Sequence, residues 1–175
     1  MLLASCNLPQ PQADTVRYFT LSSPAVAASE ADGPQVRPVQ LAGHLHGRAM
    51  AVRVAEHEVI YLEDVRWAEP LDAAITQVLR ARVGAAGAGS VITVQIQRCE
   101  LVRPGGNSVQ LAATYTVTPP GGAVQHGTFT AAPRTWDGKD YGALVGLIRD
   151  AVGELGDAIA TAATTPAVTA LPPKK

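Results

Sequence analysis

The segment from Trp67 to Leu71, with the sequence WAEPL, constrains the fold most because an extended chain becomes a helix there. Residues 57–66 before it carry apolar side chains in alternation, which is typical of a half-buried strand. From Leu71 onward, apolar residues recur every three or four positions, as they do on the buried face of a helix. Pro70 has no N–H to donate, so it suits the first helical position. Trp67 is expected to pack over this junction.

The same patterns predict an α+β fold in which an antiparallel or mixed β-sheet carries two main α-helices packed on one face. Turns rich in glycine and proline join the last three predicted strands, which favours an antiparallel meander. Residues 22–38 are rich in proline, alanine and serine and are predicted to form a long loop. The predicted strands are 16–21, 49–55, 57–65, 90–101, 107–118 and 123–132, with a further extended stretch at 39–45, and the predicted helices are 70–83 and 140–162.

The sequence LLASC, which ends at Cys6, resembles the last residues of a signal peptide that is processed in bacterial lipoproteins. The basic and apolar regions that normally precede such a site are missing, so the chain was either cut or begins upstream. Lipid attachment at Cys6 is therefore predicted, and an accidental cysteine near a terminus is the alternative. A disulfide between Cys6 and Cys99 is allowed by the cysteine count alone. If Cys6 carries lipid, Cys99 is best explained as a small buried apolar residue.

A chain of 175 residues suits one domain. Residues 1–15 are assigned to a lipobox remnant and tether, 16–163 to a single α+β domain and 164–175 to a disordered tail. The formal charge is −1 and the sequence has no basic block, so nucleic acid is not an expected partner. No apolar run reaches the roughly 18 residues of a membrane-spanning helix.

Four glycines lie along one flank of the second predicted helix, with Arg149 between them. Each glycine costs about 0.5–1 kcal/mol relative to alanine inside a helix, so the stripe suggests close approach by another backbone. That backbone could belong to the first helix, to the sheet or to a second subunit in a homo-oligomer. Drift in a chain rich in alanine and glycine is the alternative. The stripe consists of Gly142, Gly146, Gly153 and Gly156.

The histidines are the only candidates for a metal site. His44 and His46 would lie on one face of an extended segment, where His57 or His126 could complete a zinc site. No carboxylate or cysteine has a supporting spacing, so exposed loop histidines are the simpler interpretation. Sequence patterns of zinc proteases, phosphate-binding loops and serine hydrolases are absent. No catalytic residue, metal or cofactor is therefore predicted.

Three features together resemble the ABC-type transport auxiliary lipoproteins, which accompany MCE-type lipid transport systems. They are a lipidated cysteine near the start, an early strand with a Tyr-x-x-Leu pattern, and the WAEPL helix start preceded by an arginine. Between these motifs, residues 41–48 depart from the family pattern and keep only Leu45 and Arg48. The matching residues are Cys6, Tyr18, Leu21, Arg66, Trp67, Glu69, Pro70 and Leu71.

The resemblance implies a lipoprotein anchored in the outer membrane and facing the periplasm. It implies an accessory subunit that assists an MCE-domain protein and an ABC permease complex in moving lipids or other apolar molecules, without catalysing a reaction. Asn7 after the lipid site resembles signals for sorting to the outer membrane.

Three alternatives remain at this point. The chain could be an assembly or chaperone lipoprotein for an outer-membrane barrel or a lipopolysaccharide export complex. It could be a small hydrolase or metal-dependent enzyme. It could also bind lipid directly, which requires a groove lined by apolar side chains.

Overall fold

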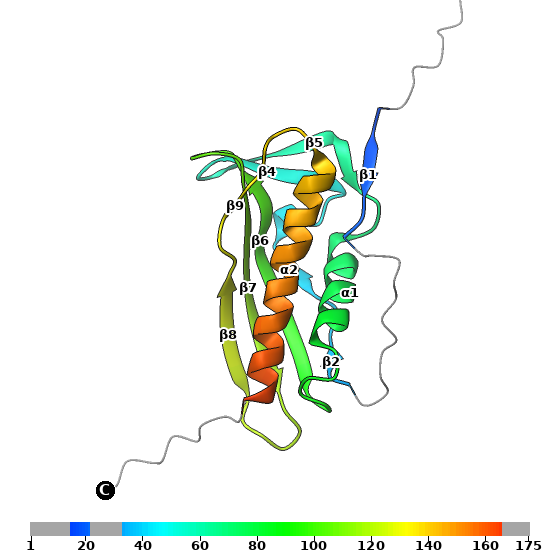
Figure 1. The fold of residues 1–175 in the computed structure, drawn as a ribbon, viewed down its shortest axis with the longest axis vertical. Coiled ribbons are helices and arrows are strands. Elements are labelled where there is room, and N and C mark those ends of the chain that lie inside the picture. Colours follow the sequence, from blue (N-terminus) through cyan, green and yellow to red (C-terminus); the bar gives the residue numbers. More distant parts are fainter. Residues whose placement is uncertain (1–14, 22–32, 166–175) are drawn as a thin grey trace, which may run out of the picture.

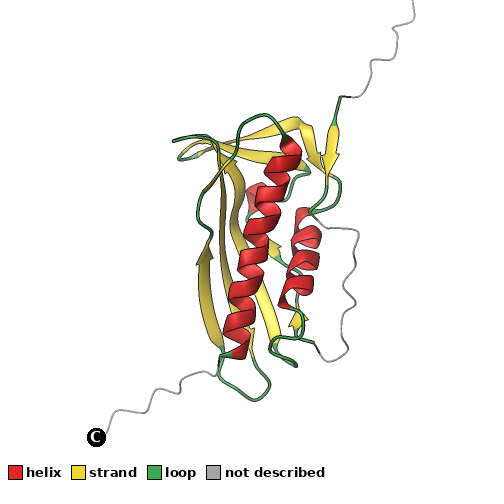
Figure 2. Cartoon of the chain, viewed as in Figure 1, coloured by secondary structure: helices red, strands yellow, loops and turns green. Residues whose placement is uncertain are grey.

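The computed structural model describes residues 15–21 and 33–165 and confirms the α+β fold. In these residues nine strands form one mixed sheet, and both α-helices lie on the same face of it (Figure 1, Figure 2). The elements are β1 (Arg17–Phe19), β2 (Gln35–Val36), β3 (Gln40–Leu41), the 3₁₀ helix η1 (Gly43–Leu45), β4 (Ala49–Ala55), β5 (Glu58–Trp67), α1 (Leu71–Val83), β6 (Val91–Val102), β7 (Ser108–Thr118), β8 (Gln125–Thr130), β9 (Arg134–Thr135) and α2 (Tyr141–Thr164).

The strands follow the order β1-β5-β4-β6-β7-β8, with β2 and β3 paired to β6 and β9 paired to β7. The predicted hairpin of β4 and β5 and the predicted meander of β6, β7 and β8 are both confirmed as antiparallel. β1 pairs with β5 in parallel, and β4 pairs with β6 in parallel. These parallel pairs make the sheet mixed and place β1 at one end of the strand order.

Three short elements differ from the prediction. Gln35 and Val36 form β2, although the segment around them was predicted to be a loop; residues 22–32 of that loop lie outside the description. The stretch predicted to be extended at 39–45 is a strand only at β3 and then turns into η1. β9 was not predicted. Two-residue strands are too short to show a periodicity, so they are identified only by their pairing with longer strands.

A bulge in β6 explains how one long strand keeps both of its ends in the core. The even-numbered residues from 92 to 96 are buried, as predicted. The register of β6 on β7 then shifts around Gln97, which is the extra residue. After this shift Cys99 and Leu101 are the residues that continue the buried row, because one inserted residue exchanges the two faces of a strand.

Both helices begin close to their predicted residues. α1 begins at Leu71, one residue later than predicted, and Pro70 remains extended with φ −56° and ψ 130°. The Pro70 carbonyl accepts a hydrogen bond from the Ala74 N–H at 3.0 Å. Asp140 caps α2 as predicted, and its carboxylate accepts a hydrogen bond from the Gly142 N–H at 2.8 Å. None of the helices in the described residues is long and apolar enough to cross a membrane.

α1 and α2 approach each other closely at Gly156. A Cβ at this position would lie 2.7 Å from Arg82 Cγ and 2.8 Å from Arg82 Cβ. Next to this contact, the Arg82 guanidinium donates two hydrogen bonds to the Asp157 carboxylate, at 2.6 and 2.7 Å. The Arg82 hydrogen bonds lower the pKa of Asp157. The second helix therefore needs a residue without a side chain where it crosses the first.

Replacing Gly156 by alanine is expected to destabilise the domain by about 1–2 kcal/mol, because the new methyl group overlaps the base of the Arg82 side chain. Gly153→Ala is the matched control, since a Cβ there meets nothing within 4 Å. This control is expected to stabilise the domain by about 0.5–1 kcal/mol through helix propensity alone. Urea unfolding measures both free energies, and equal effects of the two variants would contradict the close contact.

Candidate functional site

The two parts of the family-like motif, far apart in the sequence, form one structural unit. β1 pairs with the end of β5 so that Phe19 lies opposite Trp67. The Phe19 carbonyl accepts a hydrogen bond from the Ala68 N–H at 2.7 Å. The Thr20 hydroxyl donates to Glu69 Oε1 at 2.6 Å. The early strand is thus attached directly to the residues that start α1.

Some of the motif residues are buried in the core, and others are exposed at the surface. Leu21, Trp67 and Leu71 are buried in the hydrophobic core. Pro70 fixes the extended backbone before α1. Tyr18 is 54% exposed, so its side chain contributes little to the core and is available on the surface.

An open groove of about 400 Å³ lies between β1 and the N-terminal half of α2. Figure 1 shows these two elements near each other at one end of the domain. The groove brings together the Tyr-x-x-Leu strand and the first half of the glycine stripe, two features that the sequence alone did not connect. We call it the β1–α2 groove, and it is lined by Tyr18, Phe19, Thr20, Leu21, Gly142, Val145, Gly146 and Arg149.

The four stripe glycines have different surroundings. Gly142 and Gly146 line the β1–α2 groove. A Cβ at Gly146 or at Gly153 would meet nothing within 4 Å, whereas one at Gly156 would collide with Arg82. Contact with the first helix therefore accounts for Gly156, and a homo-oligomer interface on the stripe stays a prediction.

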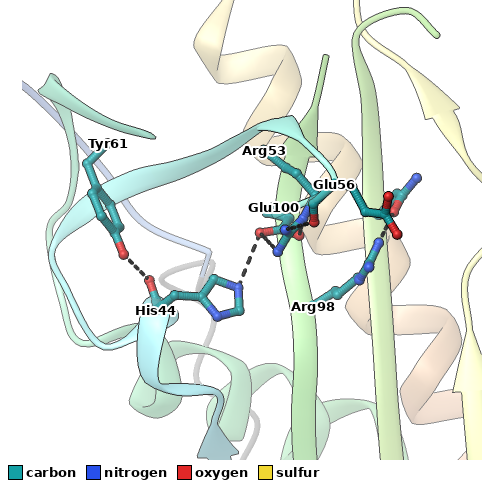
Figure 3. A network of polar contacts seen from close by, with 7 residues as sticks. His44, Arg53, Glu56, Tyr61, Arg98 and Glu100 are labelled. Atoms are coloured by element: carbon teal, nitrogen blue, oxygen red, sulfur yellow. Dashed lines mark hydrogen bonds and ion pairs between the residues drawn. The ribbon is translucent and has the colours of Figure 1, made fainter. Parts of the chain in front are cut away.

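A second polar site lies at Glu100, whose side chain is fully buried (Figure 3). Arg53 Nε donates to Glu100 Oε1 at 2.6 Å, and Arg53 also donates to the Glu56 carbonyl at 3.0 Å. His44 Nε2 lies 3.2 Å from Glu100 Oε2 but away from hydrogen-bonding geometry, so Arg53 is the main partner. The Tyr61 hydroxyl donates to the His44 carbonyl at 3.1 Å and holds η1 in place.

The bulge in β6 determines where this carboxylate points. Cys99 and Leu101 face the core, so Glu100 between them points to the opposite face of the sheet, where β4 and η1 surround it. Sequence reasoning missed the ion pair between Glu100 and Arg53. The available signal was a single charge inside the apolar run from Cys99 to Val102, because a buried charge requires a partner.

The histidines do not assemble into a metal site. His44 belongs to a 3₁₀ helix rather than to an extended segment, and its partly buried side chain faces Glu100. The prediction of an exposed loop residue is therefore wrong for His44. His46 and His57 are exposed, and His126 on β8 lies 3.2 Å from the Thr116 hydroxyl. Within the described residues, no group of three potential metal ligands is present.

Cys99 is buried and has a free thiol. Burial, with a smaller contribution from the negative charge of Glu100, raises its pKa to about 12. A protonated thiol is a poor nucleophile, so Cys99 is part of the packing. Cys6, the predicted lipid site, lies outside the described residues.

Taken together, the described residues define an α+β domain with an open surface groove and a buried structural ion pair. The chain belongs to the family of ABC-type transport auxiliary lipoprotein components, whose sequence model matches residues 19–160. The match begins at Phe19, the last residue of β1, and includes the helix start and the N-terminal half of α2. Of the residues that line the β1–α2 groove, only Tyr18 precedes the match. No curated protein matches the chain significantly.

Among the solved structures that share the fold, two illustrate the likeness. One, titled as an uncharacterized protein, has a TM-score of 0.68 and 14% sequence identity, over 83% of this chain and 96% of that one. The other, a Xanthomonas campestris protein of the DUF330 family, has a TM-score of 0.61 and 18% identity, over 85% of this chain and 91% of that one. The order of strands and helices is therefore retained in proteins that differ at most positions.

Replacing Glu100 by leucine is expected to destabilise the protein by about 3 kcal/mol, because it leaves the largely buried Arg53 guanidinium without its carboxylate. The double variant Arg53→Met with Glu100→Leu is expected to lie within about 1–2 kcal/mol of wild type, since no charge then remains buried. Urea unfolding of Glu100→Leu, Arg53→Met and the double variant gives the coupling energy between the two residues. Additive losses would contradict a direct ion pair.

The Cys99 thiol is expected not to react with a thiol reagent at about pH 8 in the native protein and to react fully in urea. A Cys6→Ser background restricts the assay to Cys99. Because the folded pKa lies above the unfolded value, stability is retained below about pH 8.5 and is lost as the pH rises further. Rapid labelling of the native protein would show that Cys99 is accessible.

Proposed function

We propose that this protein is a periplasm-facing, lipid-anchored accessory subunit of an MCE-type ABC transport system that moves lipids or other apolar molecules between membranes. The observation that carries the proposal is the family match over residues 19–160. The joining of the Tyr-x-x-Leu strand to the WAEPL helix start supports it, because these two of the three features of the resemblance form a single structural unit. In this role the protein works through its surfaces and catalyses no reaction.

Anchoring through Cys6 would hold the β1–α2 groove close to the membrane. Position 6 precedes β1 at Arg17 by eleven residues. At about 3.3–3.6 Å per residue, this length of chain spans at most roughly 40 Å. A lipid at Cys6 would therefore keep the β1–α2 groove within that distance of the outer membrane and raise its effective concentration near a membrane-bound partner.

Lipid attachment is tested in cells that express the full-length gene with its natural upstream sequence. Wild type is expected to incorporate a clickable fatty acid and to fractionate with the outer membrane, whereas Cys6→Ala is expected to do neither. A buried-site variant, Cys99→Ala, is the control for a general effect of losing a cysteine. Equal labelling of wild type and Cys6→Ala would contradict anchoring at this position.

Partner identity is tested in the same cells by formaldehyde crosslinking, affinity purification and mass spectrometry. An MCE-domain protein and its permease are expected as the enriched products, and Cys6→Ala is expected to reduce them. Stoichiometric enrichment of an outer-membrane barrel in their place would contradict the proposal and support an assembly factor.

A further inference from the structure

We propose that the β1–α2 groove binds a short extended segment of a partner protein, which carries a carboxylate side chain and adds to the outer edge of β1. This deepens the proposed docking role and rests on it for the identity of the partner. Three features of the groove favour this occupant: an open strand edge, a helix surface with little side-chain cover, and an arginine without an ion pair.

The open edge follows from the sheet order. β1 is the first strand of the order and pairs only with β5 among the described strands. Four consecutive residues, from Tyr18 to Leu21, line the groove. Tyr18 and Phe19 belong to β1, and Thr20 and Leu21 directly follow it. Since consecutive residues of a strand point to opposite faces, a hollow that touches both Tyr18 and Phe19 runs along the edge of β1 rather than beneath one face. An exposed strand edge is a template for an added strand.

The opposite wall of the groove is a stretch of α2 with little side-chain cover. Gly142 and Gly146 lie one turn apart and both line the groove. A Cβ at Gly146 would meet nothing within 4 Å, so this space is unfilled in the folded chain. Val145 and Leu21 add apolar surface beside it. This geometry admits an extended backbone and one small or apolar side chain next to the helix.

The charge at the rim selects for an acidic segment. Arg149 lines the groove, is exposed, and has no carboxylate partner in the described residues. Arg17 likewise forms no ion pair there and lies over the Phe19 ring at 5.1 Å. Arg82 and Arg134 each pair with a carboxylate, whereas described arginines elsewhere, such as Arg48 and Arg103, also form no ion pair. What distinguishes Arg149 is its place in the lining of the groove. An incoming carboxylate in the groove would lie beside Arg149 and supply the partner that this guanidinium lacks.

A peptide fits these features better than a membrane lipid does. Ligand pockets usually bury most of the ligand surface, and an open groove of about 400 Å³ would leave much of an acyl chain in water. An acyl chain also makes no use of the hydrogen-bonding groups on a strand edge. A polypeptide uses the edge, the apolar wall and the arginine together.

Binding is tested by NMR titration of the ¹⁵N-labelled 175-residue chain with a capped hexapeptide of alternating glutamate and valine. Shifts are expected in β1 and in the first half of α2. A peptide with lysine in place of glutamate and a peptide with N-methylated valines are both expected to bind at least tenfold more weakly. The first control removes the carboxylates, and the second removes main-chain donors.

Two pairs of variants test the site itself. Gly146→Leu fills the groove and is expected to weaken acidic-peptide binding at least tenfold, whereas Gly153→Leu, two turns further along α2 and equally free of contacts, is expected to change it less than twofold. Arg149→Glu is expected to reverse the preference from the acidic to the basic peptide. Arg98→Glu, an exposed arginine on β6, is its control and is expected to keep the preference.

Several outcomes would overturn the proposal. The first is an equal loss of acidic-peptide affinity in Gly146→Leu and Gly153→Leu. The second is an unchanged preference for the acidic over the basic peptide in Arg149→Glu. The third is that the peptide shifts only NMR signals of residues outside the groove. Groove shifts with dihexanoyl phosphatidylglycerol but not with the acidic peptide would indicate a lipid site instead. A change of sedimentation in Gly146→Leu without peptide binding would indicate contact between two copies of the chain.

Crosslinking in cells separates failure of this inference from failure of the proposed function. If Gly146→Leu still crosslinks to the MCE-domain protein as wild type does, the groove assignment is wrong and the accessory role stands. If wild type forms no such crosslink but binds the acidic peptide, the groove is a docking site and the proposed transport partner is wrong.

Discussion

The pairing of β1 with the end of β5 is the interaction on which the rest of the arrangement depends. It places Phe19 opposite Trp67, one residue before the backbone hydrogen bond to Ala68, where the strand gives way to α1. Leu21, Trp67 and Leu71 are then buried around the same junction. Because proline supplies no N–H and stays extended before the helix, the direction of α1 is set by the same few residues that hold β1.

The β1–α2 groove is a consequence of that junction. β1 ends the strand order, and α2 passes it with glycines on the facing side. Two kinds of small-residue packing therefore occur on one helix: Gly156 permits contact with α1, and Gly146 leaves space unfilled. Gly156 is required for α2 to pack against α1, whereas Gly146 has no packing role among the described residues. This contrast makes the two positions suitable for separating stability from binding.

Much of the fold was predictable from the sequence because the long elements carry clear periodicities. The β6–β7–β8 meander, the β4–β5 hairpin and the Asp140 cap are all local features, and the structure confirms them. β2 and β9 were missed because two residues show no period, and η1 was taken for a continued strand. The groove and the Glu100–Arg53 pair join residues far apart in the chain. Such pairings follow from the topology and the β6 bulge, which no local pattern reveals.

The short length of β1 has a mechanical consequence. This strand is joined to β5 by three register pairs and is the first element of the described residues. A pull transmitted from the N-terminal side of β1 loads these pairs before any other part of the sheet. A pull directed along the strand axis shears the three pairs together instead of opening them one at a time. Tension on the leading segment is therefore resisted at the same junction that starts α1 and borders the groove.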